Sequence, residues 1–161
     1  MKSSVAHTSR QEQLLAQLQA TPRINGFVSP DTEVRESPIH GLGLFATADI
    51  ARGSVLVAWG GHVLTKGDLA LLPPHIAHNY ALEIYPGFYL VEMRDDELDG
   101  SDFPNHSCEP NGAIVNTVVG VASRDIVSGE EITFDFSSPS GTGERVQCRC
   151  GSERCTGEVI F

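Results

Sequence analysis

The pattern of hydrophobic and polar residues changes near residue 30. In the segment "SRQEQLLAQLQA", Leu14, Leu15 and Leu18 recur at helical spacing, and Ser9 is suited to cap the first turn. The segment "TPRINGFVSPDT" then breaks this period with proline and glycine. We therefore predict a helical arm within residues 1–30, whose leucines pack against the following domain or against a second copy of the chain.

From Glu33 onward, short apolar and β-branched segments alternate with turns, which is typical of a mainly β domain. The predicted strands are "EVRES", "LGLFATA", "SVLVAW", "HVLT", "NYALEIY", "FYLVEM" and "EEITFDF". Pro86-Gly87 predicts a hairpin between two of them. The segment "AIVNTVVGVASRDI" is expected to form two strands that turn near Gly120. The segment "TKGDLALLPPHIA" is expected to form one short helix that Pro73-Pro74 ends.

Length and composition fit one globular domain with a short extension. The chain has 161 residues, of which 40% are hydrophobic and 20% are charged. Its apolar runs, such as "VLVAW", are far too short to cross a membrane, and the first residues lack the apolar segment of a secretion signal. We therefore expect an intracellular protein, cytoplasmic or nuclear, without membrane attachment.

The chain is acidic, with 11 basic and 21 acidic residues and a net charge of −10. This charge argues against direct nucleic-acid binding, which normally needs a basic surface. It suits a basic, lysine-containing protein or peptide as the partner. On charge alone, a role in solubility is the more common explanation.

Four cysteines occur, and three of them form a C-x-C-x4-C pattern: Cys148, Cys150 and Cys155. Three close thiolates can bind one tetrahedral zinc ion, and Cys108 is the only further cysteine that could complete the set. In a reducing compartment such spacing favours a metal over disulfides. The alternative is four free thiols without metal.

Two further segments have the composition of a binding site. The segment "DFPNHSCEPNG", Asp102 to Gly112, which we call the polar stretch, is a poor helix and a poor strand. In "HGLGLFA", Gly41 and Gly43 bracket one residue before a predicted strand, and glycine lets a ligand approach the backbone. Taken alone, such a pair is more often only a turn.

Taken together and in order, "HGLGLFA", "DFPNHSCEPN", "GEEITFDF" and the cysteine tail resemble the SET domain of protein-lysine methyltransferases with its post-SET zinc segment. The similarity covers roughly residues 33–161. It implies a mainly β fold of small curled sheets around a knot-like core, with the SET domain at 31–138 and the post-SET segment at 139–161. It also implies S-adenosylmethionine as methyl donor and a protein lysine as acceptor.

The resemblance also implies roles for individual residues. The loop that holds the cofactor's methionine end, and the pair that contacts the cofactor near its adenine, correspond to Gly41, Leu42, Gly43, Asn105 and His106. The post-SET ligands of one structural zinc correspond to Cys108, Cys148, Cys150 and Cys155. Phe134 corresponds to the aromatic position that tunes how many methyl groups fit.

Two positions depart from the family pattern. Phe136 stands where the family has a tyrosine at the methyl-transfer point, and Trp59 stands where it has a second tyrosine. Losing one hydrogen-bonding group at a reaction centre commonly costs ~10²–10³ in rate. The chain is then a slow lysine methyltransferase, a catalytically silent module that binds cofactor or peptide, or an enzyme that recruits another hydroxyl. Tyr80 is the candidate to supply a hydroxyl, with core packing as its alternative role.

Other features are assigned structural roles. The glutamates Glu130 and Glu131 are expected at the knot and on the surface, without acid–base catalysis. The histidines lack metal spacing with the cysteines and are predicted at the surface or in turns; they are His40, His62, His75 and His78. The helical arm is a candidate for pairing two protomers. A plain zinc-ribbon scaffold would leave the glycines and the polar stretch without a role.

Overall fold

The computed structural model describes residues 9–20, 23–137 and 144–160. The helices are α1 (Arg10–Ala20), α2 (Lys66–Leu69) and α3 (Pro74–Asn79), with 3₁₀ turns η1 (Asp95–Glu97) and η2 (Gly100–Asp102). The strands of the main body are β1 (Phe27–Val28), β2 (Thr32–Glu36), β3 (Leu42–Ala46), β4 (Val55–Ala58), β5 (His62–Thr65), β6 (Ala81–Tyr85), β7 (Phe88–Val91), β8 (Asn105–His106), β9 (Gly112–Val115), β10 (Val119–Ala122) and β11 (Glu131–Phe134). Two strands, β12 (Arg145–Gln147) and β13 (Glu158–Ile160), belong to the tail, residues 144–160.

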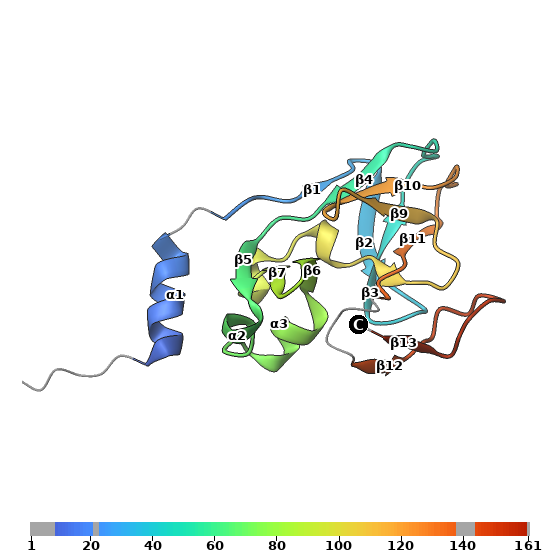
Figure 1. Ribbon diagram of the computed structural model, residues 1–161. Coiled ribbons are helices and arrows are strands. Elements are labelled where there is room, and N and C mark those ends of the chain that lie inside the picture. The colour runs from blue at the N-terminus through green and yellow to red at the C-terminus, as the bar shows by residue number, and fades with distance from the viewer. Residues whose placement is uncertain (1–8, 21–22, 138–143, 161) are drawn as a thin grey trace, which may run out of the picture.

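The strands form four small sheets (Figure 1). Their orders are β1-β4-β10-β9, β2-β3-β11-β8, β5-β7-β6 and β12-β13. The first two sheets lie together at one end of the body, and the β5–β7 sheet lies beside α2 and α3 (Figure 1). All pairings are antiparallel except that of β8 with β11. The predicted mainly β architecture is confirmed.

Two hydrophobic cores hold these sheets. The first includes Leu44, Leu56, Ile132 and Phe134, none of which is exposed to solvent. The second lies between the β5–β7 sheet and the two short helices, and its buried members are Leu64, Leu69, Leu72, Ile76, Tyr89, Val91 and Met93. Burying one such side chain contributes roughly 1.5–3 kcal/mol. Residues packed in or against both cores, including Trp59 and Tyr80, line one cleft.

Helix α1 lies within the segment predicted to form a helical arm. Its start is capped as expected, since the Ser9 hydroxyl accepts from the Glu12 N–H at 3.2 Å and the Glu12 carboxylate accepts from the Ser9 N–H at 2.7 Å. Leu14 and Leu15 pack against the second core. The side chain of Leu18 lies outside the described residues. The arm's packing partner is therefore the chain's own body, and pairing of two protomers through it stays a prediction.

The hairpin of β9 and β10 corrects one prediction. The turn lies at Asn116 and Thr117, both with positive φ, and not near Gly120. Gly120 lies inside β10. The position requires glycine because a Cβ there would approach the Phe134 ring to 2.5 Å. Gly112, on the neighbouring strand, faces the same ring, with a Cβ distance of 2.4 Å. These glycines make room for an aromatic side chain, a requirement that local sequence does not reveal.

The double proline also acts differently from its predicted role. Two short helices occupy the segment, and the second begins at Pro74. Proline fits the first turn of a helix because the N–H that it lacks has no intrahelical partner there. The Pro86-Gly87 hairpin is confirmed, with Gly87 at a φ of 80° between β6 and β7. No helix in the described ranges is long and apolar enough to span a membrane.

Candidate functional site

The polar stretch runs directly beside strand β11. Asn105 and His106 pair in parallel with Thr133 and Phe134. Farther along, the buried Asn111 side chain accepts from the Thr133 N–H at 2.9 Å and donates to the Glu131 carbonyl at 2.8 Å. An amide side chain thereby supplies the hydrogen bonds that a neighbouring strand would give. Asn111 lies beyond β8, where the stretch no longer forms a strand, so its side chain provides these bonds.

Asn105 also ties the stretch to the glycine loop, residues 39–43. Its side-chain amide donates to the carbonyls of His40 and Leu42 at 3.1 and 3.0 Å, and to the Glu131 carboxylate at 2.9 Å. Glu131 lies so close to Gly43 that a Cβ there would meet a carboxylate oxygen at 2.4 Å. Gly43 thus accommodates a structural carboxylate, as expected for Glu131. Three distant segments of the sequence meet at this point.

His106 connects β11 to the cysteines. Its Nδ1 accepts from the Phe136 N–H at 3.2 Å, and its Nε2 lies 3.5 Å from the Cys108 sulfur. Burial lowers the pKa of His106, although the charge of Asp135 opposes this shift. A neutral ring with the proton on Nε2 fits both contacts, because Nδ1 must then be the acceptor.

The four cysteines converge as predicted. The sulfurs of Cys108, Cys148, Cys150 and Cys155 all lie within 4.8 Å of one another, and those of Cys108 and Cys148 are 3.8 Å apart. Tetrahedral Zn–S bonds of about 2.3 Å would place sulfurs about 3.8 Å apart. Burial opposes ionisation of Cys150, but hydrogen bonds from Cys108 and Ser152 lower its pKa to about 5. The chemistry and spacing of these ligands therefore fit zinc.

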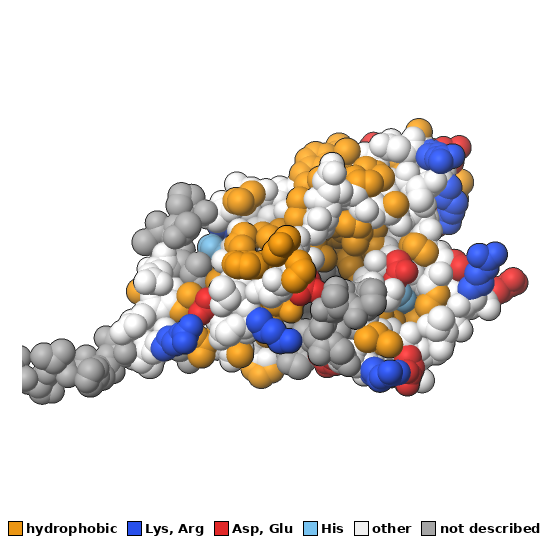
Figure 2. All heavy atoms as spheres, viewed as in Figure 1, with side chains coloured by type: hydrophobic (Ala, Val, Ile, Leu, Met, Phe, Trp, Pro, Cys, Tyr) orange, Lys and Arg blue, Asp and Glu red, His pale blue; other side chains and the backbone are white. Residues whose placement is uncertain are grey.

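A cleft of about 1010 Å³ opens between the two cores and the tail. Figure 2 shows hydrophobic side chains gathered around a hollow in the middle of this face. The lining includes residues of the glycine loop, the polar stretch and the tail, among them His40, Gly41, Leu42, Asn105, His106 and Cys148. It also includes Trp59, Tyr80, Ser101, Asp102, Ile114 and Phe136. The cleft thus brings together the predicted cofactor-binding and catalytic segments.

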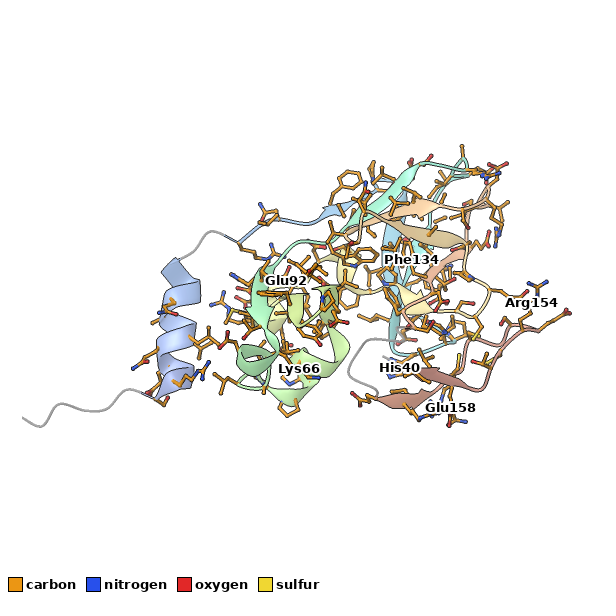
Figure 3. All side chains as sticks on the ribbon, in the orientation of Figure 1. His40, Lys66, Glu92, Phe134, Arg154 and Glu158 are labelled. Carbon is orange, nitrogen blue, oxygen red and sulfur yellow. The ribbon has the colours of Figure 1, made fainter. Side chains whose placement is uncertain are left out.

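The predicted aromatic residues do not all face this cleft. Phe134 is wholly buried within the sheet region and is not among the lining residues (Figure 3). It packs edge-on against Trp59, with centroids 5.3 Å apart, and lies 6.0 Å from Phe136. Trp59 and Phe136 do line the cleft. Phe134 therefore packs against Trp59 and Phe136, the aromatic residues that line the cleft. Its proposed effect on the number of methyl groups stays a prediction.

The indole of Trp59 is held in place by a hydrogen bond from its Nε1–H to the Ser101 carbonyl at 2.7 Å. Phe136 carries no hydroxyl, so neither aromatic side chain offers a free O–H at this wall. Tyr80, at the end of α3, lines the cleft and also packs against the second core. Both roles considered for Tyr80 are therefore compatible with its position.

Asp102 is a cleft residue to which the sequence analysis assigned no role. It closes η2 with a capping box, accepting from the Asp99 N–H at 2.8 Å. Burial raises the pKa of Asp102 to about 7, and the charges of Glu92 and Asp99 act in the same direction. The nearby negative charge of Asp102 also raises the pKa of Tyr80, after the larger effect of burial. Its place at the start of the polar stretch was the only available signal.

The other charged residues mostly have structural roles. Glu130 accepts from the Asn111 amide at 3.1 Å and pairs with Arg124, as expected for a structural carboxylate. His75 is exposed, in agreement with the prediction, and the His78 side chain lies outside the described residues. His62 is a correction: it is 8% exposed and its Nε2 lies 3.7 Å from a carboxylate oxygen of Glu97. It is buried because β5 is covered on this side.

Comparison with known proteins decides the family. The sequence profile described as "SET domain" matches residues 41–137. The chain belongs to the SET domain family. The matched range contains the glycines at 41 and 43, the polar stretch and β11.

Curated SET relatives are similar over most of the chain. The chain is 32% identical over 147 residues to the H3 lysine-36 specific histone-lysine N-methyltransferase of Yarrowia lipolytica, covering 84% of this chain and 19% of that protein. It is 32% identical over 136 residues to the histone-lysine N-methyltransferase trithorax of Drosophila virilis, covering 76% and 3%. The chain thus spans less than a fifth of the length of these two relatives.

Solved structures confirm the SET fold. The methyltransferase domain of human histone-lysine N-methyltransferase SETMAR superposes with a TM-score of 0.63 at 22% identity, covering 83% of this chain and 59% of that one. KRYPTONITE, in complex with mCHH DNA, an H3(1-15) peptide and SAH, gives a TM-score of 0.60 at 22% identity, covering 81% and 30%.

Proposed function

We propose that this SET domain transfers methyl groups from S-adenosylmethionine to a lysine side chain of a protein. The observation that carries the proposal is the cleft, which brings the glycine loop, the polar stretch and an aromatic wall together beside the tail. Its SET relatives are named histone-lysine N-methyltransferases, and a structural neighbour was solved with SAH, the demethylated form of this donor.

The cofactor would occupy the part of the cleft between the glycine loop and the tail. Gly41 has a φ of 48° and no atom within 4 Å of a would-be Cβ, so its backbone is open to a ligand. The Asn105 side chain is already bonded to the loop, so its contact with cofactor would come from main-chain atoms. His106 and Leu42 also line the cleft.

The four cysteines would hold one structural zinc ion. Zinc would fasten the tail to the polar stretch through Cys108, since the other three ligands all belong to the tail. The tail residues Val146, Gln147, Cys148 and Arg149 line the cleft. Loss of the metal should therefore weaken cofactor binding as well as stability.

The residues around Trp59 would receive the substrate lysine. The amine must lose its proton before it attacks the methyl carbon, against an ordinary pKa of about 10.4. An apolar wall of Trp59, Ile114 and Phe136 lowers that pKa by desolvation. Because no hydroxyl is available from Phe136, Tyr80 would supply the hydrogen bond that orients the nitrogen. Positioning of this kind provides much of the rate in such displacements.

We propose a basic protein as the substrate, with a histone H3 tail as the first to test. The net charge of −10 would attract such a chain, and the KRYPTONITE structure contains an H3(1-15) peptide. Incubation of the full chain with S-adenosylmethionine and histones, read by mass spectrometry, should show lysine mass gains in steps of one methyl group replacing one hydrogen. Absence of transfer to histones and to a broad panel of basic proteins would reject the enzymatic proposal.

A silent binding module is the second candidate, and the missing hydroxyls at Phe136 and Trp59 favour it. Under this alternative the chain binds S-adenosylhomocysteine, detected through the fluorescence of its single tryptophan, but transfers no methyl group. Phe136→Tyr discriminates the two. A gain of about 100-fold or more from an inactive parent would identify a lapsed enzyme, whereas a strongly active parent would reject the silent module.

A further inference from the structure

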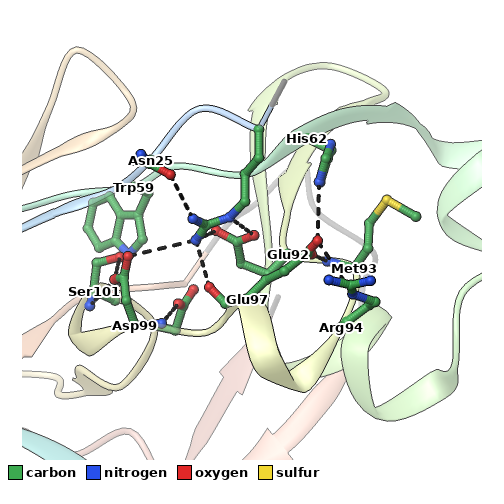
Figure 4. Close-up of polar contacts among 11 residues, drawn as sticks. Asn25, Trp59, His62, Glu92, Met93, Arg94, Glu97, Asp99 and Ser101 are labelled. Carbon is green, nitrogen blue, oxygen red and sulfur yellow. Dashed lines mark hydrogen bonds and ion pairs between the residues drawn. The ribbon is translucent and has the colours of Figure 1, made fainter. Parts of the chain in front are cut away.

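An acidic cluster, formed by Glu92, Glu97, Asp99 and Asp102, lies in the segment whose Ser101 carbonyl holds the Trp59 indole. Figure 4 shows its hydrogen bonds among residues of the chain following β7 and the segment before β1. The Arg23 guanidinium forms two bonds with the buried Glu92 carboxylate, at 2.6 and 2.5 Å, and donates to the Glu97 carbonyl at 2.6 Å. Asp99 lies 3.7 Å from the same guanidinium. The single positive charge of Arg23 is thus used by Glu92 and shared with Asp99.

Asp102 is the member of this cluster that lines the cleft. Its carboxylate accepts from the Asp99 N–H, and no basic side chain in the described part of the sequence forms a hydrogen bond or ion pair with it. Lys66 also lines the cleft but is not paired with it. Ser101, the residue before Asp102, holds the Trp59 indole through its carbonyl. A partly buried carboxylate without a cation therefore lies at the aromatic wall.

We infer that Asp102 is the group that receives the substrate's ammonium in this cleft. The inference rests on the proposed function and deepens it. Other carboxylates also line the cleft, but Glu83 accepts from the Gly87 N–H and Asp135 accepts from the Ser137 N–H. Asp102 follows Ser101, whose carbonyl holds the Trp59 indole, and Tyr80 is its neighbouring hydroxyl. A carboxylate in a partly desolvated site forms a charge-assisted bond with an ammonium that is stronger than a neutral one.

The same carboxylate can accept the proton that the amine must lose. The ammonium passes one proton to the carboxylate, leaving a neutral amine and a carboxylic acid. The nitrogen lone pair then forms a bond to the donor's methyl carbon, and the carbon–sulfur bond breaks with its electron pair going to sulfur. The carboxylic acid returns its proton to water. The pKa of about 7 supports this step, because it brings the acceptor closer to the amine than an ordinary aspartate.

The groups that shift the pKa of Asp102 belong to several elements. Glu92 after β7, Asp99 before η2 and Arg23 before β1 act on it through their charges, and Tyr80 at the end of α3 is the neighbouring hydroxyl. Two of the three charged groups are acidic, which favours retention of a proton or binding of a cation. A bound lysine ammonium satisfies this requirement before it passes its proton to Asp102.

The test uses n-butylammonium as probe and n-butanol as its neutral counterpart, with S-adenosylhomocysteine present. The indole N–H signal of Trp59, the only tryptophan, reports binding by NMR. The wild type should bind the ammonium roughly 10- to 100-fold more tightly than the alcohol at pH 8. Asp102→Asn should abolish this preference, while Asp96→Asn, which removes the same charge from an exposed side chain, should keep it.

The outcomes separate this inference from the proposed function. A wild type without preference for the ammonium, or an Asp102→Asn variant that retains it, overturns the inference. If the preference depends on Asp102 but no methyl transfer to any basic protein is found, the enzymatic proposal fails and the amine site stands. Where transfer occurs, Asp102→Asn should lower kcat/KM for the lysine substrate and remove its decline below pH 7, with the affinity for S-adenosylhomocysteine unchanged.

Discussion

Replacement of Asp102 by asparagine should stabilise the unliganded protein, and by an amount that grows with pH. The pKa of this carboxyl is raised from 3.8 to about 7, mainly by burial. Below pH 3.8 the folded and unfolded chains both hold the proton. Between 3.8 and 7 only the unfolded chain releases it, so folding stability falls as pH rises through this window. Asparagine avoids this loss and still accepts from the Asp99 N–H.

The magnitude follows from the size of the shift. About three pKa units at 1.36 kcal/mol each give a penalty of about 4 kcal/mol once both states are ionised. Linkage places the advantage of Asp102→Asn at about 2 kcal/mol at pH 5 and about 4 kcal/mol at pH 8. Titrating groups that do not interact with Asp102 contribute equally to both proteins, so the difference between the proteins reports Asp102 together with the charged groups around it.

Urea unfolding followed by Trp59 fluorescence, at several pH values from 5 to 8, measures this difference. Asp96→Asn is the matched control: its side chain is 71% exposed, and its effect should stay within about 0.5 kcal/mol at every pH. A difference between Asp102→Asn and the wild type that does not change with pH would refute the assignment of a protonated, desolvated carboxyl. A destabilised Asp102→Asn variant would refute it as well.

Three further predictions concern the metal, the core and the polar stretch. Cys108→Ser should lower zinc content, measured by atomic emission, below the one ion per chain expected of the parent, and should weaken S-adenosylhomocysteine binding. Gly120→Ala should destabilise the fold by about 1–3 kcal/mol in urea unfolding, since its methyl would meet the Phe134 ring at 2.5 Å. Asn111→Ala should cost about 2–4 kcal/mol, because it leaves the Thr133 N–H and the Glu131 carbonyl without their side-chain partners.

The sequence predicted most of the strands because their alternation and turn residues are local signals. The Pro86-Gly87 hairpin and the capped helix α1 are examples. The sequence analysis misplaced the β9–β10 turn because glycine is common in turns. Gly120 is instead required inside β10, where it leaves room for the Phe134 ring from a strand distant in sequence. The same limit applies to Gly43, whose neighbour Glu131 is far away in sequence. Glycines required by long-range packing cannot be distinguished from turn glycines along one chain.

The site was predicted unevenly for a related reason. The convergence of the cysteines followed from ligand chemistry, since four thiols need one another to bind a tetrahedral ion. The burial of Phe134 and His62 depends on which elements cover them, and periodicity does not report this. Asp102 was missed because an aspartate two residues from both a glycine and a proline is ordinary in a loop. Only the fold shows that its carboxyl is desolvated and faces a cleft.

Arg23 links the segment before β1 to the proposed chemistry. Its guanidinium is bound to Glu92, a carboxylate that is only 3% exposed, and to the Glu97 carbonyl in η1. Removing one partner of such a buried pair typically costs about 3–5 kcal/mol. The η1–η2 segment carries both Asp102 and the Ser101 carbonyl that holds Trp59. The Trp59 indole and the proposed amine-receiving carboxylate are therefore positioned by the same anchored loop, so a hydroxyl missing from Phe136 can be replaced by a polar group that this loop holds at the cleft.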